Sequence, residues 1–200
     1  LKQAALRYGV AQPSKAIVIG EGSSNGVDTS AFKSEAVDAE KRKALISKYQ
    51  LENKTVIGFV GRVTEHKGVY ELVASFEKIY ESNKDARLIL MGHIKCDPAF
   101  EERFQSHPGI IHIPFQDDVP LYMSLFDIFV LPSLREGFPN VPIQAAAMGI
   151  PVSGITAQGA GCTGICGSCS LNCAPGIVAL LLLAGKAIYK RYHSGVVQHE

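Results

Sequence analysis

The sequence lacks both a long hydrophobic run and an excess of charge of either sign. Its longest apolar stretch, Ile177–Ala184, has eight residues, well short of the roughly 18–20 that a helix needs to cross a bilayer. Residues 1–8 have neither the apolar core nor the cleavage site of a secretory signal peptide. The formal net charge of +1 argues against a nucleic-acid binder that relies on bulk charge. We therefore expect a cytoplasmic protein whose thiols stay reduced or bind metal.

Charge is also missing from one long segment. Of the 39 charged residues, 35 lie in positions 1–136, and the stretch 137–185 contains none. Four of the five cysteines fall in that stretch. We therefore expect two parts, a patterned domain over 1–159 and an atypical Cys/Gly-rich and apolar tail over 160–200. Because the chain starts with Leu1 rather than Met, we expect a fragment of a longer protein.

What is present over the first part is an alternation of apolar runs with helical patterns. A helix is expected from about 67 to 81, where one stripe of apolar positions has helical spacing: Val69, Leu72, Val73, Phe76 and Tyr80. The short β-rich runs predict strands at 16–20, 55–60, 87–92, 110–113, 127–133 and 150–152. This pattern predicts an α/β fold, a Rossmann-like parallel sheet with helices on both faces. Ligands of such sheets bind beyond the carboxyl ends of the strands.

Gly61, Arg62, Lys67 and Gly68 follow one of these expected strands. The glycines allow close approach of the backbone to a ligand, and the cations flank the start of a helix. Helix amino termini offer free N–H groups and a positive dipole end to phosphate. Arg62 suits bidentate contact with phosphate oxygens, and Lys67 supplies a movable point charge. On these residues alone, the alternative is a turn with two solvated cations.

Glu136, Gly137 and Phe138 follow a later expected strand, and Gln144 lies about two helical turns beyond Glu136. Both polar side chains could face one crevice, and the backbone of Gly137 and Phe138, with a proline at the helix entrance, could cradle an anion. The alternative is an exposed loop acid and a surface amide.

These motifs carry a family resemblance when they are taken in order. Gly58–Arg62 with Lys67-Gly68, then Leu131–Asn140 with Gln144, resemble the donor-binding, carboxyl-terminal lobe of GT-B retaining nucleotide-sugar glycosyltransferases (group 1, family 4). Asn25–Phe32 resembles the loop that opens that lobe. The resemblance runs from about residue 16 to residue 159.

The resemblance implies a role for each catalytic candidate. Arg62 and Lys67 would hold the diphosphate of the donor and stabilise its charge as it leaves. Glu136 would contact the donor sugar. Gln144 stands where the family has a second acid that bonds the ribose hydroxyls, and its amide can still accept such a bond.

Further donor contacts are implied at five positions. Gly61 would let the backbone approach the donor, Gly137 and Phe138 would offer backbone N–H groups to phosphate, and the region around His93 and Ile113 would meet the base. The base itself, and hence whether the donor is a UDP-, GDP- or ADP-sugar, stays open.

The resemblance also implies an activity and partners. It implies transfer of a hexose in surface polysaccharide biosynthesis, without a metal or cofactor, onto a lipid-linked or glycan acceptor. The family's acceptor-binding amino-terminal lobe is missing, so we expect the chain alone to bind a nucleotide but not to transfer sugar. The alternative is a nucleotide-phosphate-binding fragment without catalysis.

The cysteine-rich tail leaves three interpretations open. Four thiols at close spacing suit zinc or an iron–sulfur cluster: Cys162, Cys166, Cys169 and Cys173. Alternatively, a shifted reading frame, a rearranged gene end or decay has replaced the family's own terminus. As a third interpretation, Ile177–Ala184 with the cations behind it lies on the inner face of a membrane as an interfacial anchor.

Overall fold

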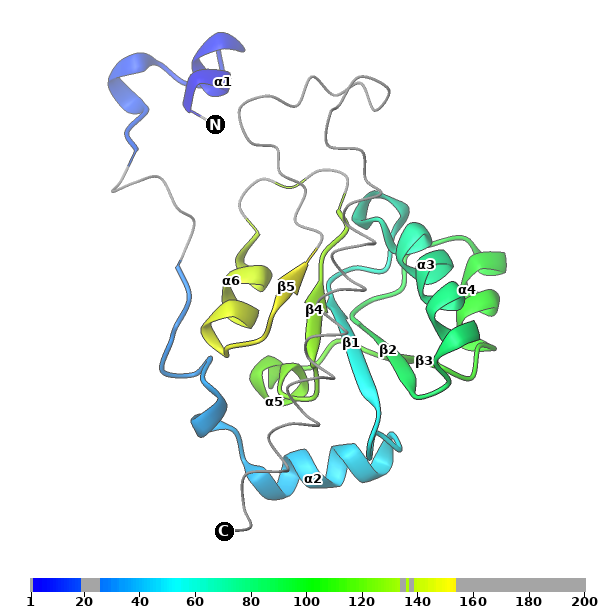
Figure 1. Ribbon diagram of the computed structural model, residues 1–200. Helices are drawn as coiled ribbons and strands as arrows, with labels where there is room; N and C mark the ends of the chain where they lie inside the picture. Colours follow the sequence, from blue (N-terminus) through cyan, green and yellow to red (C-terminus); the bar gives the residue numbers. More distant parts are fainter. Residues whose placement is uncertain (1, 19–25, 134–135, 137–138, 154–200) are drawn as a thin grey trace.

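The computed structural model describes residues 2–18, 26–133, 136 and 139–153, and within them a five-stranded parallel sheet (Figure 1). This confirms the predicted α/β fold class. The strands are β1 (Thr55–Val60), β2 (Ala86–Met91), β3 (Ile110–Ile113), β4 (Ile128–Val130) and β5 (Val152–Ser153). The α-helices are α1 (Lys2–Arg7), α2 (Ala39–Lys48), α3 (Val69–Ser82), α4 (Pro98–Gln105), α5 (Val119–Met123) and α6 (Asn140–Ala147). The expected tail, 160–200, lies outside the described residues.

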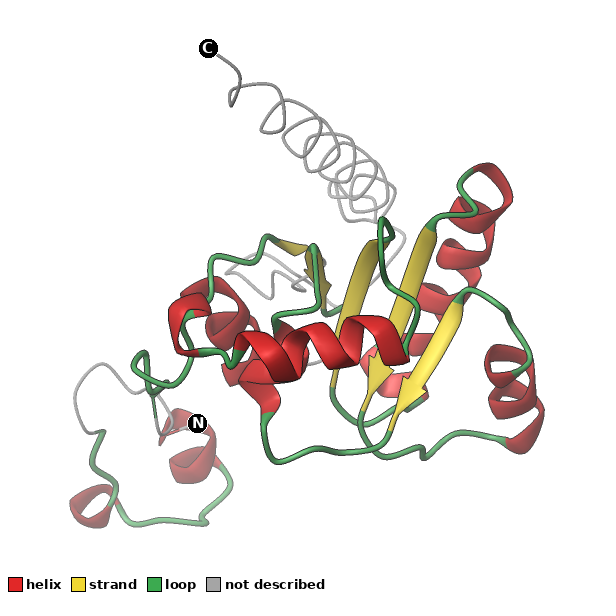
Figure 2. Cartoon of the chain, turned by 90° about the horizontal axis from the view of Figure 1, so that it is seen from below, coloured by secondary structure: helices red, strands yellow, loops and turns green. Residues whose placement is uncertain are grey.

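The strand order is β3-β2-β1-β4-β5, so the chain reverses its direction of growth at β1. From β1 it moves outward through β2 to β3, then returns to pair β4 with the other side of β1. Helices α3 and α4 pack beside β2 and β3, and α6 contacts β5 (Figure 2). In parallel sheets of this kind the ligand crevice lies at such a reversal, beyond the carboxyl ends of the two strands. Here those ends belong to β1 and β4.

The helix expected at 67–81 is α3, and its apolar stripe explains why it forms. Val69, Leu72, Val73 and Phe76 are buried, and α3 contacts β2. Burial of such a stripe, rather than intrinsic propensity, supplies most of a helix's stability. The prediction for this helix is therefore confirmed to within two residues at its start.

The expected strand at 16–20 is wrong for the residues that can be checked. Ala16–Val18 have no strand pairing within the described part of the chain, and Ile17 is 81% exposed. An apolar run becomes a strand only when a neighbouring strand completes its backbone hydrogen bonds. Residues 19 and 20 lie outside the described residues.

Gly58 is required where β1 meets the segment before β4. A Cβ atom built there would lie 2.1–2.4 Å from three ring carbons of Phe126. Asp127, the next residue, accepts a hydrogen bond from the Val56 backbone N–H (2.8 Å). The absence of a side chain at position 58 thus lets Phe126 pack flat on the central strand beside the β1–β4 reversal.

An ion pair joins α3 to α4 and makes stability depend on pH. The guanidinium of Arg103 donates to both carboxylate oxygens of Glu77, at 2.9 Å for the Nε bond. These hydrogen bonds hold the pKa of Glu77 below its ordinary 4.5. A carboxyl whose folded-state pKa is lowered stabilises the fold above its unfolded pKa, and the contribution is lost as pH falls through the folded pKa.

We therefore expect Glu77→Gln to lower the free energy of unfolding at pH 7 by about 0.5–1 kcal/mol. The deficit relative to wild type should shrink as pH falls below 4.5. Urea unfolding at a series of pH values measures it, with the exposed Glu71→Gln on the same helix as control. A deficit that is constant with pH would show that the pair does not contribute through its charge.

Candidate functional site

The carboxyl end of β1 continues as a short extended segment beside the end of β2. The N–H of Gly61 donates to the Met91 carbonyl, and that of Val63 to the His93 carbonyl, both at 2.9 Å. Val63 is fully buried, whereas Arg62 is exposed. Arg62 makes no hydrogen bond or ion pair with the described part of the chain. Arg62 thus lies exposed at the edge of the sheet where the ligand is predicted to bind.

The segment then turns back against the end of β4. The short 3-10 turn η3 (Glu65–Lys67) ends at Gly68, whose φ of +66° lies in the left-handed region. A Cβ atom on Gly68 would lie 2.1 Å from the carbonyl oxygen of Pro132. Both the φ value and the close approach call for glycine. Helix α3 begins directly afterwards, so its amino terminus lies at the β1–β4 reversal.

Lys67 and Glu136 meet at this reversal although they are 69 residues apart in sequence. The ammonium of Lys67 lies 2.5 Å from Oε1 of Glu136. The two side chains are 23% and 17% exposed, so water screens the pair only partly. The structure thus brings together two of the three residues predicted to be catalytic, and it does so at the predicted edge.

The residues predicted to meet the base lie at the ends of β2 and β3. His93 is exposed, and its ring stacks on Phe115 with centroids 5.5 Å apart and an interplanar angle of 16°. Phe115 is itself 55% exposed. The Ile113 side chain is buried in the core, and its carbonyl accepts from the Gly92 N–H. Only backbone or neighbouring atoms of Ile113 could therefore face a ligand.

The second half of the site is described in part. Gln144 is half-buried on α6. At the start of that helix the side-chain oxygen of Asn140 is buried and has no hydrogen-bond partner among the described residues. Gly137, Phe138, Cys162, Cys166, Cys169 and Cys173 lie outside the described residues. Within the described ranges, no three His, Cys, Asp or Glu side chains gather as metal ligands would.

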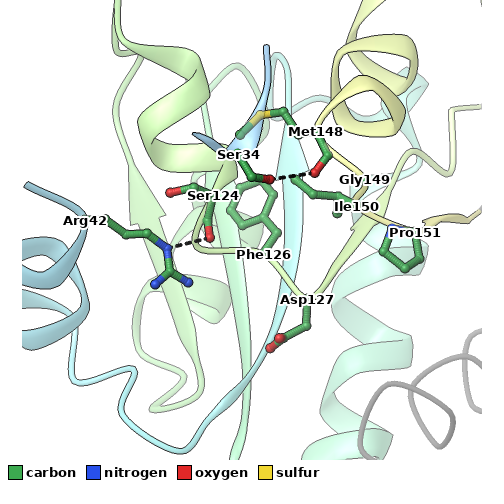
Figure 3. A pocket seen from close by; sticks show the side chains of 9 residues that line it. All are labelled: Ser34, Arg42, Ser124, Phe126, Asp127, Met148, Gly149, Ile150 and Pro151. Atoms are coloured by element: carbon green, nitrogen blue, oxygen red, sulfur yellow. Dashed lines mark hydrogen bonds between the residues drawn. The ribbon is translucent and has the colours of Figure 1, made fainter. Parts of the chain in front are cut away.

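A pocket of about 350 Å³ lies at the opposite, amino-terminal edge of the sheet (Figure 3). Asp127 and Pro151, the residues that precede β4 and β5, are part of its lining. Arg42 donates from Nε to the Ser124 carbonyl at its rim (3.1 Å). This pocket is separated from Lys67 and Glu136 by the length of the strands, so the predicted chemistry does not belong to it.

Comparison with known proteins decides the family. The family model described as glycosyl transferases group 1 matches residues 54–176, which include β1 to β5 and every predicted site residue. The chain belongs to the group 1 glycosyltransferases. The capsular polysaccharide biosynthesis glycosyltransferase CapM of Staphylococcus aureus is similar at 31% identity over 164 residues. That match covers 80% of this chain and 42% of CapM.

Solved structures of glycosyltransferases share the fold. Anabaena HepE in complex with UDP-glucose matches with a TM-score of 0.58 at 20% identity, over 76% of this chain and 41% of HepE. The carboxyl-terminal domain of the group 1 protein LpcC from Francisella tularensis matches with a TM-score of 0.52 at 24% identity, over 66% of this chain and 74% of that domain. The described sheet is thus one lobe of the GT-B type. The chain spans less than half the length of CapM and HepE.

Phe115 and Ser133 of this glycosyltransferase lobe contact residues of the candidate site, Phe115 the His93 ring and Ser133 the His66 backbone, and neither was given a role from the sequence. Phe115 follows Pro114, directly after an expected strand. A large apolar residue at the carboxyl end of a strand could have indicated a contact with a ligand. Ser133 is fully buried at the end of β4, and its short polar side chain after Pro132 is a weaker signal. Among the described helices, none is long and apolar enough to cross a membrane.

Proposed function

We propose that this chain is the donor-binding lobe of a retaining glycosyltransferase and that it binds the diphosphate of a nucleotide sugar between the ends of β1 and β4. The observation that carries the proposal is the meeting of Lys67 and Glu136 at the strand reversal, beside the start of α3. A cation there is near free helix N–H groups, which suits phosphate oxygens. The complex of HepE with UDP-glucose supports UDP as the first nucleotide to test.

The proposed chemistry uses the cations of this edge as electrostatic catalysts. Lys67 would leave Glu136 for the phosphate, and the exposed Arg62 would add bidentate hydrogen bonds. Both would stabilise the charge that develops on the diphosphate as the bond to the sugar breaks. Glu136, once released, would accept a hydrogen bond from a sugar hydroxyl, and Gln144 from the ribose. Backbone N–H groups of Gly137 and Phe138 are proposed as further phosphate donors.

The acceptor is proposed to bind elsewhere than on the described sheet. CapM is more than twice as long as its matched region, which supports a second lobe for the acceptor, a lipid-linked precursor or a glycan. We propose that residues 1–200 alone bind the nucleotide without transferring a hexose, and that the protein works in the cytoplasm, at the inner face of the membrane where the acceptor is lipid-linked.

Calorimetric titration of the chain with UDP, GDP and ADP tests the proposal, with the corresponding monophosphate titrated separately for comparison. We expect at least one diphosphate to bind, and to bind about tenfold or more tightly than its monophosphate, because the second phosphate gains a charge-assisted contact of about 1.5–3 kcal/mol. Failure of all three diphosphates to bind would refute the proposal. Sugar transfer by the 200-residue chain would refute its claim about the acceptor lobe.

A further inference from the structure

The turn that carries Lys67 is anchored to the end of β4 on both sides of that residue. Before it, the Ser133 hydroxyl donates to the carbonyl of His66 at 3.3 Å. After it, the Gly68 Cα lies so close to the Pro132 carbonyl that no Cβ would fit. Two consecutive residues of the β4 end thus hold the two residues that flank Lys67.

This anchoring adds to the few hydrogen bonds that the described residues make inside the turn. Inside the turn, the backbone bonds are Lys67 N–H to Thr64 (3.1 Å) and Gly68 N–H to Glu65 (2.8 Å). Thr64, at its start, makes no side-chain cap. Single 3-10 turns have poor hydrogen-bond geometry and are short for that reason. A contact from outside the turn therefore helps to fix where the lysine side chain starts.

Ser133 is placed to supply that contact. It is fully buried, so water does not compete for its hydroxyl, and the segment after it carries Glu136. One short stretch thus positions the backbone of the cation and presents the acid that pairs with it. A lysine has a long flexible side chain. Fixing the backbone from which it starts reduces the conformational entropy that is lost when the ammonium binds a ligand.

We propose that Ser133 is a positioning residue for donor binding, whose hydroxyl holds the Lys67 turn where the ammonium meets the diphosphate. This inference rests on the proposed function. Ser133 does not touch the donor in this account. It acts through Lys67, and that separates its role from a general contribution to stability.

A double-mutant cycle tests the coupling between the two residues. The probe is whichever of UDP, GDP and ADP the wild-type chain binds most tightly. We expect Ser133→Ala to weaken its binding about three- to tenfold, the range of one hydrogen bond. In the Lys67→Ala background the same substitution should change affinity less than twofold. Ser133→Cys, which keeps the shape with a somewhat larger atom and donates weakly, should fall between wild type and alanine.

Ser124→Ala is the matched control, because the Ser124 hydroxyl also donates to a backbone carbonyl (Leu121, 2.6 Å) but at the other edge of the sheet. It should leave affinity unchanged. Equal losses from Ser133→Ala with and without Lys67, or no loss at all, would overturn the inference and leave the proposed function standing. Absence of diphosphate binding by wild type would overturn both. If Ser133→Ala does not fold, the same cycle with Ser133→Cys decides.

Discussion

Lys67→Ala is expected to weaken nucleoside diphosphate binding by about 10- to 100-fold. A hydrogen bond to a charged group contributes about 1.5–3 kcal/mol, and about 1.4 kcal/mol corresponds to a factor of ten. The substitution also leaves the carboxylate of Glu136, now only 17% exposed, without its cation and facing an anionic ligand. Calorimetry measures the loss directly. Lys78→Ala, which removes an exposed cation from α3, should change affinity less than twofold.

Glu136→Gln should act in the opposite direction on a diphosphate that carries no sugar. The Glu136 carboxylate pairs with the Lys67 ammonium at 2.5 Å, so a phosphate must displace it. An amide is a weaker competitor, and we expect affinity for UDP to rise about three- to tenfold. For UDP-glucose the gain in affinity should be smaller, because in our proposal Glu136 also accepts a hydrogen bond from the sugar. If both variants weakened UDP binding equally, the exchange of Lys67 between acid and phosphate would be wrong.

Gly58→Ala is expected to lower the free energy of unfolding by about 3 kcal/mol, at the upper end of the cost of overpacking a core. The added methyl group would lie within 2.1–2.4 Å of the Phe126 ring, and β1 is hydrogen-bonded on both sides. Neither the strand nor the ring can move without disturbing the pairing of β1 with β4. A loss of this size is a large fraction of the roughly 5–15 kcal/mol typical of a folded domain. Urea unfolding measures it.

Two comparisons isolate the steric cause. With Phe126→Leu as background, Gly58→Ala should cost about 1 kcal/mol or less, because the ring that blocks the methyl group is gone. Gly149→Ala meets nothing within 4 Å although its φ is +73°, so it should cost only the conformational strain of about 1–2 kcal/mol. Equal losses at Gly58 in both backgrounds would contradict the packing argument.

Periodicity in the sequence predicted local elements of the sheet, and with them the strand ends at which the candidate residues lie. The stripe of Val69, Leu72 and Phe76 specified α3, and apolar runs marked the strands of the sheet. The run at 16–20 misled because burial of an apolar stretch depends on a partner that periodicity does not reveal.

The pairing of Lys67 with Glu136 was beyond sequence reasoning for a physical reason. The two residues follow strands that are not consecutive in the chain, and only the order β2-β1-β4 makes their carboxyl ends neighbours. Strand order is decided by how crossover helices pack. The same holds for Ser133, whose bond to the His66 backbone depends on the β1–β4 contact. Residues within one motif lie near one another through their sequence spacing, whereas contacts between motifs depend on the fold.

We propose above that the donor diphosphate binds at the carboxyl edge of the sheet between β1 and β4. Amide NMR of the isotopically labelled chain during titration with UDP tests it most directly. We expect the amide signals of Gly61, Gly68 and Gly92 to shift together, while that of Gly149, at the pocket of the opposite edge, stays in place. Shifts that cluster at Gly149 and its neighbours, with the three other glycines unmoved, would contradict it.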